Sequence, residues 1–572
     1  MIVTLAYMGR SGVRNGGRRN VVSLAPNLAR DPVAFDAPLR FPLRFREAIS
    51  ALHDVVISDL RFQPRDKTAY QLWKQGEQQR LEVLRRARFD LAKEEIMSRG
   101  DVPADLETNY NRLRTAYWKA RNKYSNFLMH HDQELWRMLM PCDPVITIAK
   151  DVVFFECFSA DESSYGCLTV NRGDGFGGSH GAQLGTTNVD YSWNLFNQFQ
   201  SLRSYRQTRF NVDPSGFEVS TEGAEEFREE KIDLPQGWLR GFMQLQGAMG
   251  LPMRRVSLSR EAVYSLLAWL RRHKAKESPR AIRFELADGV SPQMVLEPWG
   301  KTIVSHATKY HGPDTEPIRI WGRRRLQILA RVLPLADRID VHLLGTGLPS
   351  FWVVQMGEMR LTVGLSGWTT NDWTRGSALD LLSPPVTPST ELVDRLGSFV
   401  QTQGRAKRNQ IESYGGTNPA ESLAAMNHLA HSGQVIFDLD DDIYRWRQIM
   451  PQEVGERDMG PENHELAGSR KLVEQKRVEV HSTETTDKGE TKHSGKVGNM
   501  PVAMSINADG RITRGKCFCG HHQRAGIRMG PCRHLLALRE AAERANEVFA
   551  TPEQTTEGWY NRIRAWLGGK PT

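Results

Sequence analysis

Three cysteines and one histidine near the end of the chain follow a Cys-x-Cys, twelve-residue gap, Cys-x-His pattern, with Cys517, Cys519, Cys532 and His534 as its members. Alternate residues of a strand face the same way, so Cys517 and Cys519 can converge on one ion. Three thiolates and one imidazole form a closed tetrahedral set that leaves no position for a reactive water. The pattern therefore predicts a structural Zn²⁺ rather than a catalytic one.

The residues around these ligands predict a strand pair that runs into a helix. Residues 504–507 and 511–519 have strand character, and the Asp-Gly turn at 508–510 between them is typical of a hairpin. Pro531 stands where a helix can begin, and apolar residues recur with helical spacing over 535–549. Cys532 and His534 are then expected at the helix entrance, facing the strand pair.

Two alternatives to this ligand set remain open. His521 or His522, in the predicted loop, could replace His534, and the cysteines could be free thiols or a disulfide pair. Cysteine is sparse, with 6 in 572 residues, and no disulfide framework is indicated, which is typical of a reducing cytoplasm. The other three are expected to be buried thiols: Cys142, Cys157 and Cys167.

The stretch Cys-Phe-Cys, a loop, then Pro-Cys-Arg-His-Leu-Leu-Ala-Leu resembles the SWIM zinc finger, whose pattern is Cys-x-Cys, a variable gap, Cys-x-His and an apolar helix. The resemblance covers residues 500–540. It implies a binding module, because SWIM fingers are associated with DNA binding and with protein–protein contacts. It does not choose between these ligands.

The domain order and the tract 184–219 (LGTTNVDYSWN…GFEV) are also similar to the long bacterial SWIM proteins encoded beside MoxR-type AAA+ ATPases and von Willebrand factor A proteins. This resemblance implies an adaptor or recognition subunit of an ATPase-driven assembly. A MoxR-type ATPase and a von Willebrand factor A protein would then be its protein partners.

A basic charge balance favours acidic partners such as DNA or RNA. The net charge is +9 and the isoelectric point is near 9.2, which is a modest excess for this length. The predicted zinc finger is more basic than the rest and has few acids. Its expected phosphate contacts are Arg511, Arg514, Lys516, Arg524, Arg528, Arg533 and Arg539.

The chain is long enough for several domains, and its patterns predict a multidomain α+β protein. Residues 1–45 mix Gly, Arg, Asn and Pro and are expected to be an irregular basic arm. Residues 46–140 predict a helical hairpin, with an apolar seam at alternating steps of four and three from Leu106 to Phe127. Short β-type runs predict a β-rich region over 141–230, and mixed helices and strands predict an α+β domain over 235–385.

Three short helical stretches followed by a hairpin over 386–450 resemble a winged-helix domain. The third stretch, 419–432, has no Lys or Arg, and the predicted wing carries Asp438, Asp440, Asp441 and Asp442. Acidic residues are repelled by phosphates, so a protein-docking or structural role is favoured over insertion into a DNA groove. An alternative role for the acidic run is Mg²⁺ binding.

A polar connector is predicted over 451–495, with one strand near 476–481 that could join the hairpin of the zinc finger (496–550). Residues 551–572 are expected to be a tail. The first residues lack a signal peptide, and no apolar stretch is long enough for a membrane span, so a cytoplasmic location is expected.

Two classes of function compete. The first is a non-enzymatic zinc-dependent adaptor that contacts nucleic acid through the finger and proteins through the winged helix and the helical hairpin. The alternative is a nuclease or transposase-like enzyme in which the finger only directs a catalytic domain. No Walker, Gly-x-Ser-x-Gly or His-Glu-x-x-His motif occurs, and the nearest cluster, around His130 and His131, lacks ligand spacing.

Overall fold

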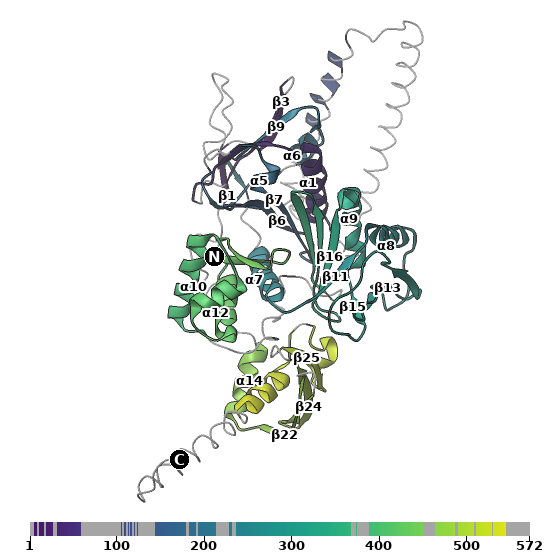
Figure 1. Cartoon of the computed structure of the whole chain (residues 1–572), viewed down its shortest axis with the longest axis vertical. Helices are drawn as coiled ribbons and strands as arrows, with labels where there is room; N and C mark the ends of the chain where they lie inside the picture. Colours follow the sequence, from purple (N-terminus) through teal and green to yellow (C-terminus); the bar gives the residue numbers. More distant parts are fainter. Residues whose placement is uncertain are drawn as a thin grey trace, which may run out of the picture. The chain divides into compact units, whose positions relative to one another are not determined.

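A computed structural model of the chain describes residues 5–8, 11–16, 19–26, 31–58, ten positions between 105 and 123, 144–178, 182–189, 191, 193–212, 228–231, 236–367, 373, 382, 388–449, 464–486, 490–507, 511–528 and 530–544 (Figure 1). It is a mixed α/β protein with several sheets. Two compact units are present. Met1–Ser58 and Cys142–Thr572 form the first, and Asp59–Pro141 forms the second.

The largest sheet has eight strands in the order β11-β16-β17-β18-β7-β6-β5-β8, and neighbouring strands are antiparallel. Its strands are β5 (Val145–Ile148), β6 (Val152–Phe158), β7 (Ser164–Asn171), β8 (Gly185–Asn188), β11 (Arg254–Leu258), β16 (Arg338–Leu343), β17 (Ser350–Met356) and β18 (Met359–Leu365). The regions 141–230 and 235–385 therefore share one sheet. Treating them as separate domains was wrong, because the β18–β7 pairing joins strands far apart in the chain.

Helix α1 (Pro42–Val56) packs on this sheet through a buried face that includes Phe45, Leu52 and Val55 (Figure 1). Gly166 on β7 allows the close approach, since a Cβ there would lie 2.8 Å from the Leu52 side chain. The predicted hairpin boundary at residue 46 was wrong, because α1 belongs to the first unit. Most of the predicted hairpin seam lies outside the described residues.

In the described part of the predicted irregular arm, 1–45, most residues instead belong to β-strands. A four-stranded sheet runs in the order β2-β3-β9-β4, and β1 pairs with β10. The bounds are β1 (Leu5–Met8), β2 (Gly12–Gly16), β3 (Arg19–Leu24), β4 (Phe35–Leu39), β9 (Gln207–Val212) and β10 (Arg228–Lys231). Both β3 and β4 pair with β9, so their stability depends on a partner that is distant in the sequence. Local composition could not reveal that partner.

A smaller sheet, β14-β13-β12-β15, follows helix α8 in the chain. Its strands are β12 (Ile282–Glu285), β13 (Gln293–Leu296), β14 (Lys301–Val304) and β15 (Ile318–Ile320). The helices of this part of the chain are α5 (Arg172–Gly175), α6 (Trp193–Phe199), α7 (Gln236–Met249), α8 (Arg260–Arg272), η1 (Arg323–Ile328), α9 (Leu329–Val332) and η2 (Leu333–Leu335). Ser259 caps α8 by accepting a hydrogen bond from the Ala262 amide.

Residues 390–446 contain three helices and a hairpin in the predicted order. The elements are α10 (Thr390–Gln403), β19 (Arg405–Lys407), α11 (Arg408–Gly415), α12 (Pro419–His431), β20 (Val435–Asp438) and β21 (Ile443–Trp446). Strand β19 was not predicted, and it pairs with β21 to give the sheet β19-β21-β20. Gly404 ends α10 with a φ of 79°, which is the left-handed conformation that glycine adopts without strain.

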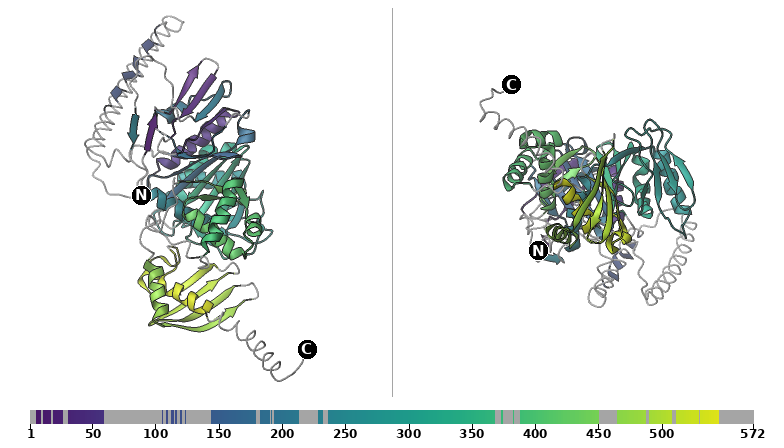
Figure 2. Two further views of the ribbon diagram at one scale, coloured as in Figure 1. Left: turned by 90° about the vertical axis from the view of Figure 1, so that its left-hand side faces the viewer. Right: turned by 90° about the horizontal axis from the view of Figure 1, so that it is seen from below.

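Residues 464–544, called here the C-terminal module, form a four-stranded antiparallel sheet, β22-β23-β24-β25, with helices on one side (Figure 2). The elements are α14 (His464–Glu474), β22 (Val478–Thr485), β23 (Thr491–Val497), β24 (Met500–Ile506), β25 (Ile512–Cys517), α15 (Gly520–Ala525) and a last helix over 533–544. The predicted hairpin is confirmed. The strand expected near 476–481 is present as β22, and it joins the sheet of the hairpin through β23. The rest of the connector prediction was wrong from 464 onward, because β23 and the end of β22 expose many polar side chains and their composition is that of a linker.

None of the helices in the described part of the chain combines the length and the apolar character needed to cross a membrane.

Candidate metal centre

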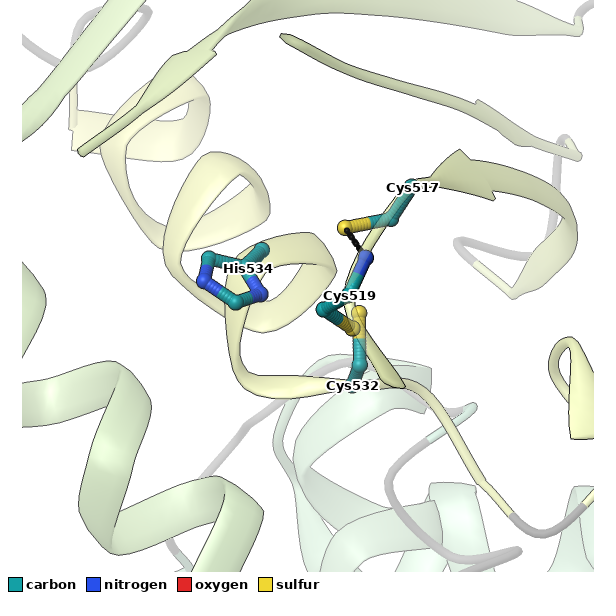
Figure 3. A group of neighbouring side chains, drawn as sticks. All are labelled: Cys517, Cys519, Cys532 and His534. Atoms are coloured by element: carbon teal, nitrogen blue, oxygen red, sulfur yellow. Dashed lines mark hydrogen bonds between the residues drawn. The ribbon is translucent and has the colours of Figure 1, made fainter. Parts of the chain in front are cut away.

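Cys517, Cys519, Cys532 and His534 converge at the junction of the sheet and the last helix of the C-terminal module (Figure 3). Their ligand atoms all lie within 4.8 Å of one another. A tetrahedron with Zn–S bonds of about 2.3 Å has ligand separations of roughly 3.8 Å, so small side-chain movements would complete it. The four residues could therefore hold one metal ion.

Each ligand is positioned by a different local feature. Cys517 ends β25, and Cys519 caps α15, where its Sγ accepts a hydrogen bond from the His522 amide at 3.4 Å. Cys532 directly precedes the last helix, and His534 lies in its first turn. All three cysteines are buried. The first two ligands thus come from the junction of β25 and α15, and the last two come from the start of the last helix.

Hydrogen bonds to the sulfurs favour the ionised form of Cys517. The Cys519 amide donates to Sγ of Cys517 at 3.5 Å. A hydrogen bond from the Cys532 thiol, opposed by burial, lowers the pKa of Cys517 to about 3. The same hydrogen bond, together with burial, raises the pKa of Cys532, and burial raises that of Cys519. A bound dication would supply the positive charge that lets all three sulfurs ionise.

The imidazole of His534 is turned toward the sulfurs in Figure 3. Its Nδ1 is buried, and the imidazole interacts with Cys517, where it acts to lower the pKa of that thiol. His521 and His522 are outside the cluster. His522 has its Nε2 3.1 Å from the carbonyl oxygen of Gly515. The geometry thus favours His534 over the two alternatives, and the donor set is compatible with zinc.

Two contacts position the last helix at this point, one with the sheet and one with α14. Gly515 on β25 leaves room for it, since a Cβ at this position would lie 2.6 Å from the Leu535 side chain. Glu465 of α14 accepts hydrogen bonds from the Arg533 amide at 2.7 Å and from its guanidinium at 2.8 Å. The Glu465 contact was missed by sequence reasoning, because α14 lies in the region expected to be a connector.

The seven predicted phosphate contacts do not form one surface. Arg514, Lys516 and Arg524 are exposed, and Arg528 is half-buried. The remaining three are engaged inside the protein. Arg539 is 2% exposed and pairs with Glu543, Arg533 pairs with Glu465, and Arg511 donates to the carbonyl oxygens of Pro252 and Leu344.

The acidic run after β20 is bound by arginines. Arg445, which is 2% exposed, contacts Asp438 and Asp441 at 2.8 Å and Asp151 at 2.6 Å. Arg360 on β18 also pairs with Asp438 and Asp441. Burial acts to raise the pKa of Asp441, but the two guanidiniums lower it below its ordinary value. These carboxylates therefore join the 390–446 region to the eight-stranded sheet, which gives the run a structural role in place of the Mg²⁺ alternative.

Within the described ranges, the Cys517 cluster is the one group of three or more Cys, His, Asp or Glu that could hold a metal. His130 and His131, the nearest catalytic candidates in the sequence, lie outside the described residues.

No protein-family model matches the chain, and a search of curated proteins found no match. Among solved structures, the chain is similar to proliferating cellular nuclear antigen from Entamoeba histolytica, with 12% identity, 39% of this chain and 89% of that one covered, and a TM-score of 0.28. A second similar structure is A. fulgidus PCNA with the C-terminal region of FEN-1, with 12% identity, 40% of this chain and 91% of that one covered, and a TM-score of 0.28. A third is the PCNA2–PCNA3 complex of Sulfolobus tokodaii, with 8% identity, 40% of this chain and 90% of that one covered, and a TM-score of 0.27. Likenesses this weak support no conclusion about fold or function.

Proposed function

We propose that this protein is a zinc-dependent, non-enzymatic adaptor whose C-terminal module binds nucleic acid as a SWIM-type finger. The observation that carries the proposal is the convergence of three thiols and one imidazole into a closed four-ligand set. Such a set leaves no position for substrate or water, so its function is to hold the module in shape. A module held in this way is suited to present a surface to a partner.

The charge of the module supports a nucleic-acid partner. Arg514, Lys516 and Arg524 are exposed, and the whole chain has a net charge of +9. Exposed cations bind phosphates at little desolvation cost, and binding of this kind weakens steeply as salt is added.

The 390–446 region is proposed to be a winged helix that docks protein. Its order of helix, strand, two helices and hairpin supports this assignment. Helix α12 has no Lys or Arg. In the acidic turn, Asp441 forms ion pairs with Arg360 and Arg445 of the same chain. Both features disfavour DNA reading by this region. Its proposed partners, from the family resemblance, are a MoxR-type ATPase and a von Willebrand factor A protein of the cytoplasm.

Metal content tests the zinc proposal. Purified protein should contain about one zinc per chain. Cys532→Ser should release it and increase hydrogen exchange in residues 478–517, while exchange in the eight-stranded sheet stays unchanged. Cys167→Ser, which changes a buried thiol outside the cluster, should keep the zinc. Full zinc content in the Cys532→Ser variant would contradict the ligand set.

Gel shifts at several salt concentrations test the nucleic-acid proposal. Reversal of Arg514, Lys516 and Arg524 to Glu should abolish retardation of DNA and RNA. As a matched control, reversal of Arg271 and Arg272, which are exposed on α8, should leave it intact. Retardation that persists in the first variant would place the contact elsewhere.

Co-purification tests the partner proposal. Capture of the full chain from its native cell should recover an AAA+ ATPase, and introduction of charge at the exposed Asn409 and Ser413 of α11, as Asn409→Glu with Ser413→Glu, should reduce its yield without affecting zinc content. Failure to recover any ATPase under gentle salt conditions would contradict the adaptor role.

A further inference from the structure

The sheet of the C-terminal module has two different faces. His493, Val497, Val502 and Met504 point to the face that the last helix covers, and all four are buried. Gly495 shares this face, since a Cβ there would lie 2.8 Å from Leu538. Side chains alternate along a strand, so their neighbours in sequence point to the opposite side. This opposite side, called here the open face, carries no helix in the described part of the module (Figure 2).

On the open face, cations of β23 and β25 lie on either side of the middle strand, β24. The register places Lys492 on β23 opposite Ser505 on β24, and Ser505 opposite Arg514 on β25. In the next row Ala503 lies opposite Lys516. Lys492, Arg514 and Lys516 are exposed. The middle strand thus contributes small side chains, and the strands beside it contribute positive charge.

A third row adds an aromatic ring. Lys496 on β23 lies opposite Pro501 on β24, and both are exposed. Beyond β25, Phe518 continues the outward alternation of Arg514 and Lys516, and it is 56% exposed. Because Phe518 stands between Cys517 and Cys519, the two ligands would hold its backbone in place. An exposed ring whose backbone is held in this way is available for a base to stack on.

Carboxylates near this face do not neutralise its exposed cations, although Ser505, between Lys492 and Arg514, is itself buried. Glu316 pairs with Arg514 at 2.6 Å, but both side chains are mostly exposed, at 72% and 59%, and exposed pairs of this kind are weak. Glu479 and Glu484 lie opposite Lys496 and Lys492 on β22, on the side away from β24. The centre of the face, over β24 and β25, therefore keeps a positive field.

We infer that this open face binds single-stranded nucleic acid, with the backbone between the cations of β23 and β25 and a base stacked on Phe518. The inference rests on the proposed nucleic-acid function and specifies its ligand. Neighbouring strands lie about 4.8 Å apart, so β23 and β25 are separated by roughly 10 Å, which suits one strand better than a duplex. Stacking on a protein ring requires an unpaired base, and a duplex does not offer one.

Fluorescence anisotropy with the zinc-loaded full chain tests the inference, using oligothymidine, oligouridine and a duplex of the same length. Both single strands should bind more tightly than the duplex. Phe518→Ala should weaken single-strand binding by roughly 5- to 100-fold, as expected for the loss of one stacked base, and Phe518→Trp should preserve it. Duplex binding should change little in either variant.

Neutralised lysines test the path of the backbone. Lys496→Gln together with Lys516→Gln should reduce the slope of log affinity against log salt by about 1.4, since each phosphate contact with a single strand contributes about 0.7. Lys407→Gln with Lys471→Gln removes the same charge at exposed positions outside the open face and should leave the slope unchanged. Equal zinc content and circular dichroism confirm that each variant is folded.

The outcomes separate this inference from the proposed function. If the wild type binds neither single strands nor duplex, both fail. If it binds nucleic acid but prefers the duplex, or if Phe518→Ala and the lysine pair change nothing, only the open-face inference fails. Displacement by polyglutamate as efficient as by oligothymidine would also overturn it, because an acidic protein would then be the better partner.

Discussion

A fully buried ion pair joins the region that follows β21 to the eight-stranded sheet, and breaking it should destabilise the protein strongly. Nη1 of Arg447 lies 3.3 Å from Oε2 of Glu156 on β6, and both side chains are 0% exposed. Tyr165 donates a hydrogen bond to the other carboxylate oxygen at 2.8 Å. We predict that Arg447→Met lowers the free energy of unfolding by about 3–5 kcal/mol, the usual cost of leaving one buried charge without its partner.

The loss should be electrostatic rather than steric. The guanidinium carbon of Arg447 lies 5.0 Å from the centre of the Phe242 ring, and methionine can fill much of the same space. Glu156→Gln removes the negative charge and keeps an acceptor for Tyr165. The double variant Arg447→Met with Glu156→Gln should therefore recover to within about 2 kcal/mol of the wild type, although each single variant is costly.

Urea unfolding measures these differences, and hydrogen exchange of peptides from β6 and β21 locates them. The exchange data are needed because a chain of several domains need not unfold in one step. If the effects of the two single changes simply add in the double variant, to within about 0.5 kcal/mol, the residues are not coupled and the reasoning is refuted.

The same variant has a predicted pH dependence. Burial raises the pKa of Glu156 above its ordinary 4.5, and Arg447 acts to lower it. Without Arg447 the folded state should hold a proton that the unfolded chain releases above pH 4.5. Stability then falls as pH rises, so the deficit of Arg447→Met should be larger at pH 8 than at pH 5. A deficit equal at both pH values would contradict the assignment.

Two further changes test other parts of the fold. Gly495→Ala should destabilise the C-terminal module by about 1–3 kcal/mol, because the added Cβ would lie 2.2 Å from the Glu479 carbonyl oxygen. Faster hydrogen exchange over 478–497 would report the loss, and Ser494→Ala is the control that should be tolerated. Burial lowers the pKa of His342 to about 4 from 6.5, so the unfolded state takes up a proton first and stability falls as pH drops through 6.5 toward 4. His342→Gln should remove up to about 3.5 kcal/mol of that acid loss in urea titrations, from 2.5 pH units at about 1.4 kcal/mol each. His311→Gln at an exposed position should not remove it, and an unchanged slope in His342→Gln would refute the assignment.

Features built from neighbouring residues could be predicted from the sequence. The hairpin before Cys517 depends on a local turn, and the helix after Cys532 depends on a proline and apolar spacing. The three helices over 390–431 likewise carry their own caps and periodicity. Such signals lie within one or two turns of the element that they specify, so a single sequence is sufficient to read them.

Features built from distant residues could not be predicted. Strands β2 to β4 appeared irregular because β9 completes their sheet, and β23 with the end of β22 appeared to be a linker because their outer faces are polar. The acidic run at Asp438 gave no sign of Arg360, which lies on another sheet. Exposure was also invisible in the sequence, so buried Arg539 and exposed Arg514 appeared equivalent.

The segment Asp59–Pro141 departs after α1 and returns just before β5, and both of these elements belong to the first unit. No strand of the eight-stranded sheet comes from within it. The chain between α1 and β5 is therefore a position where one segment can be replaced by another. Excision of residues 59–141 and closure with a short glycine-rich loop should leave the hydrophobic core formed by the described residues complete.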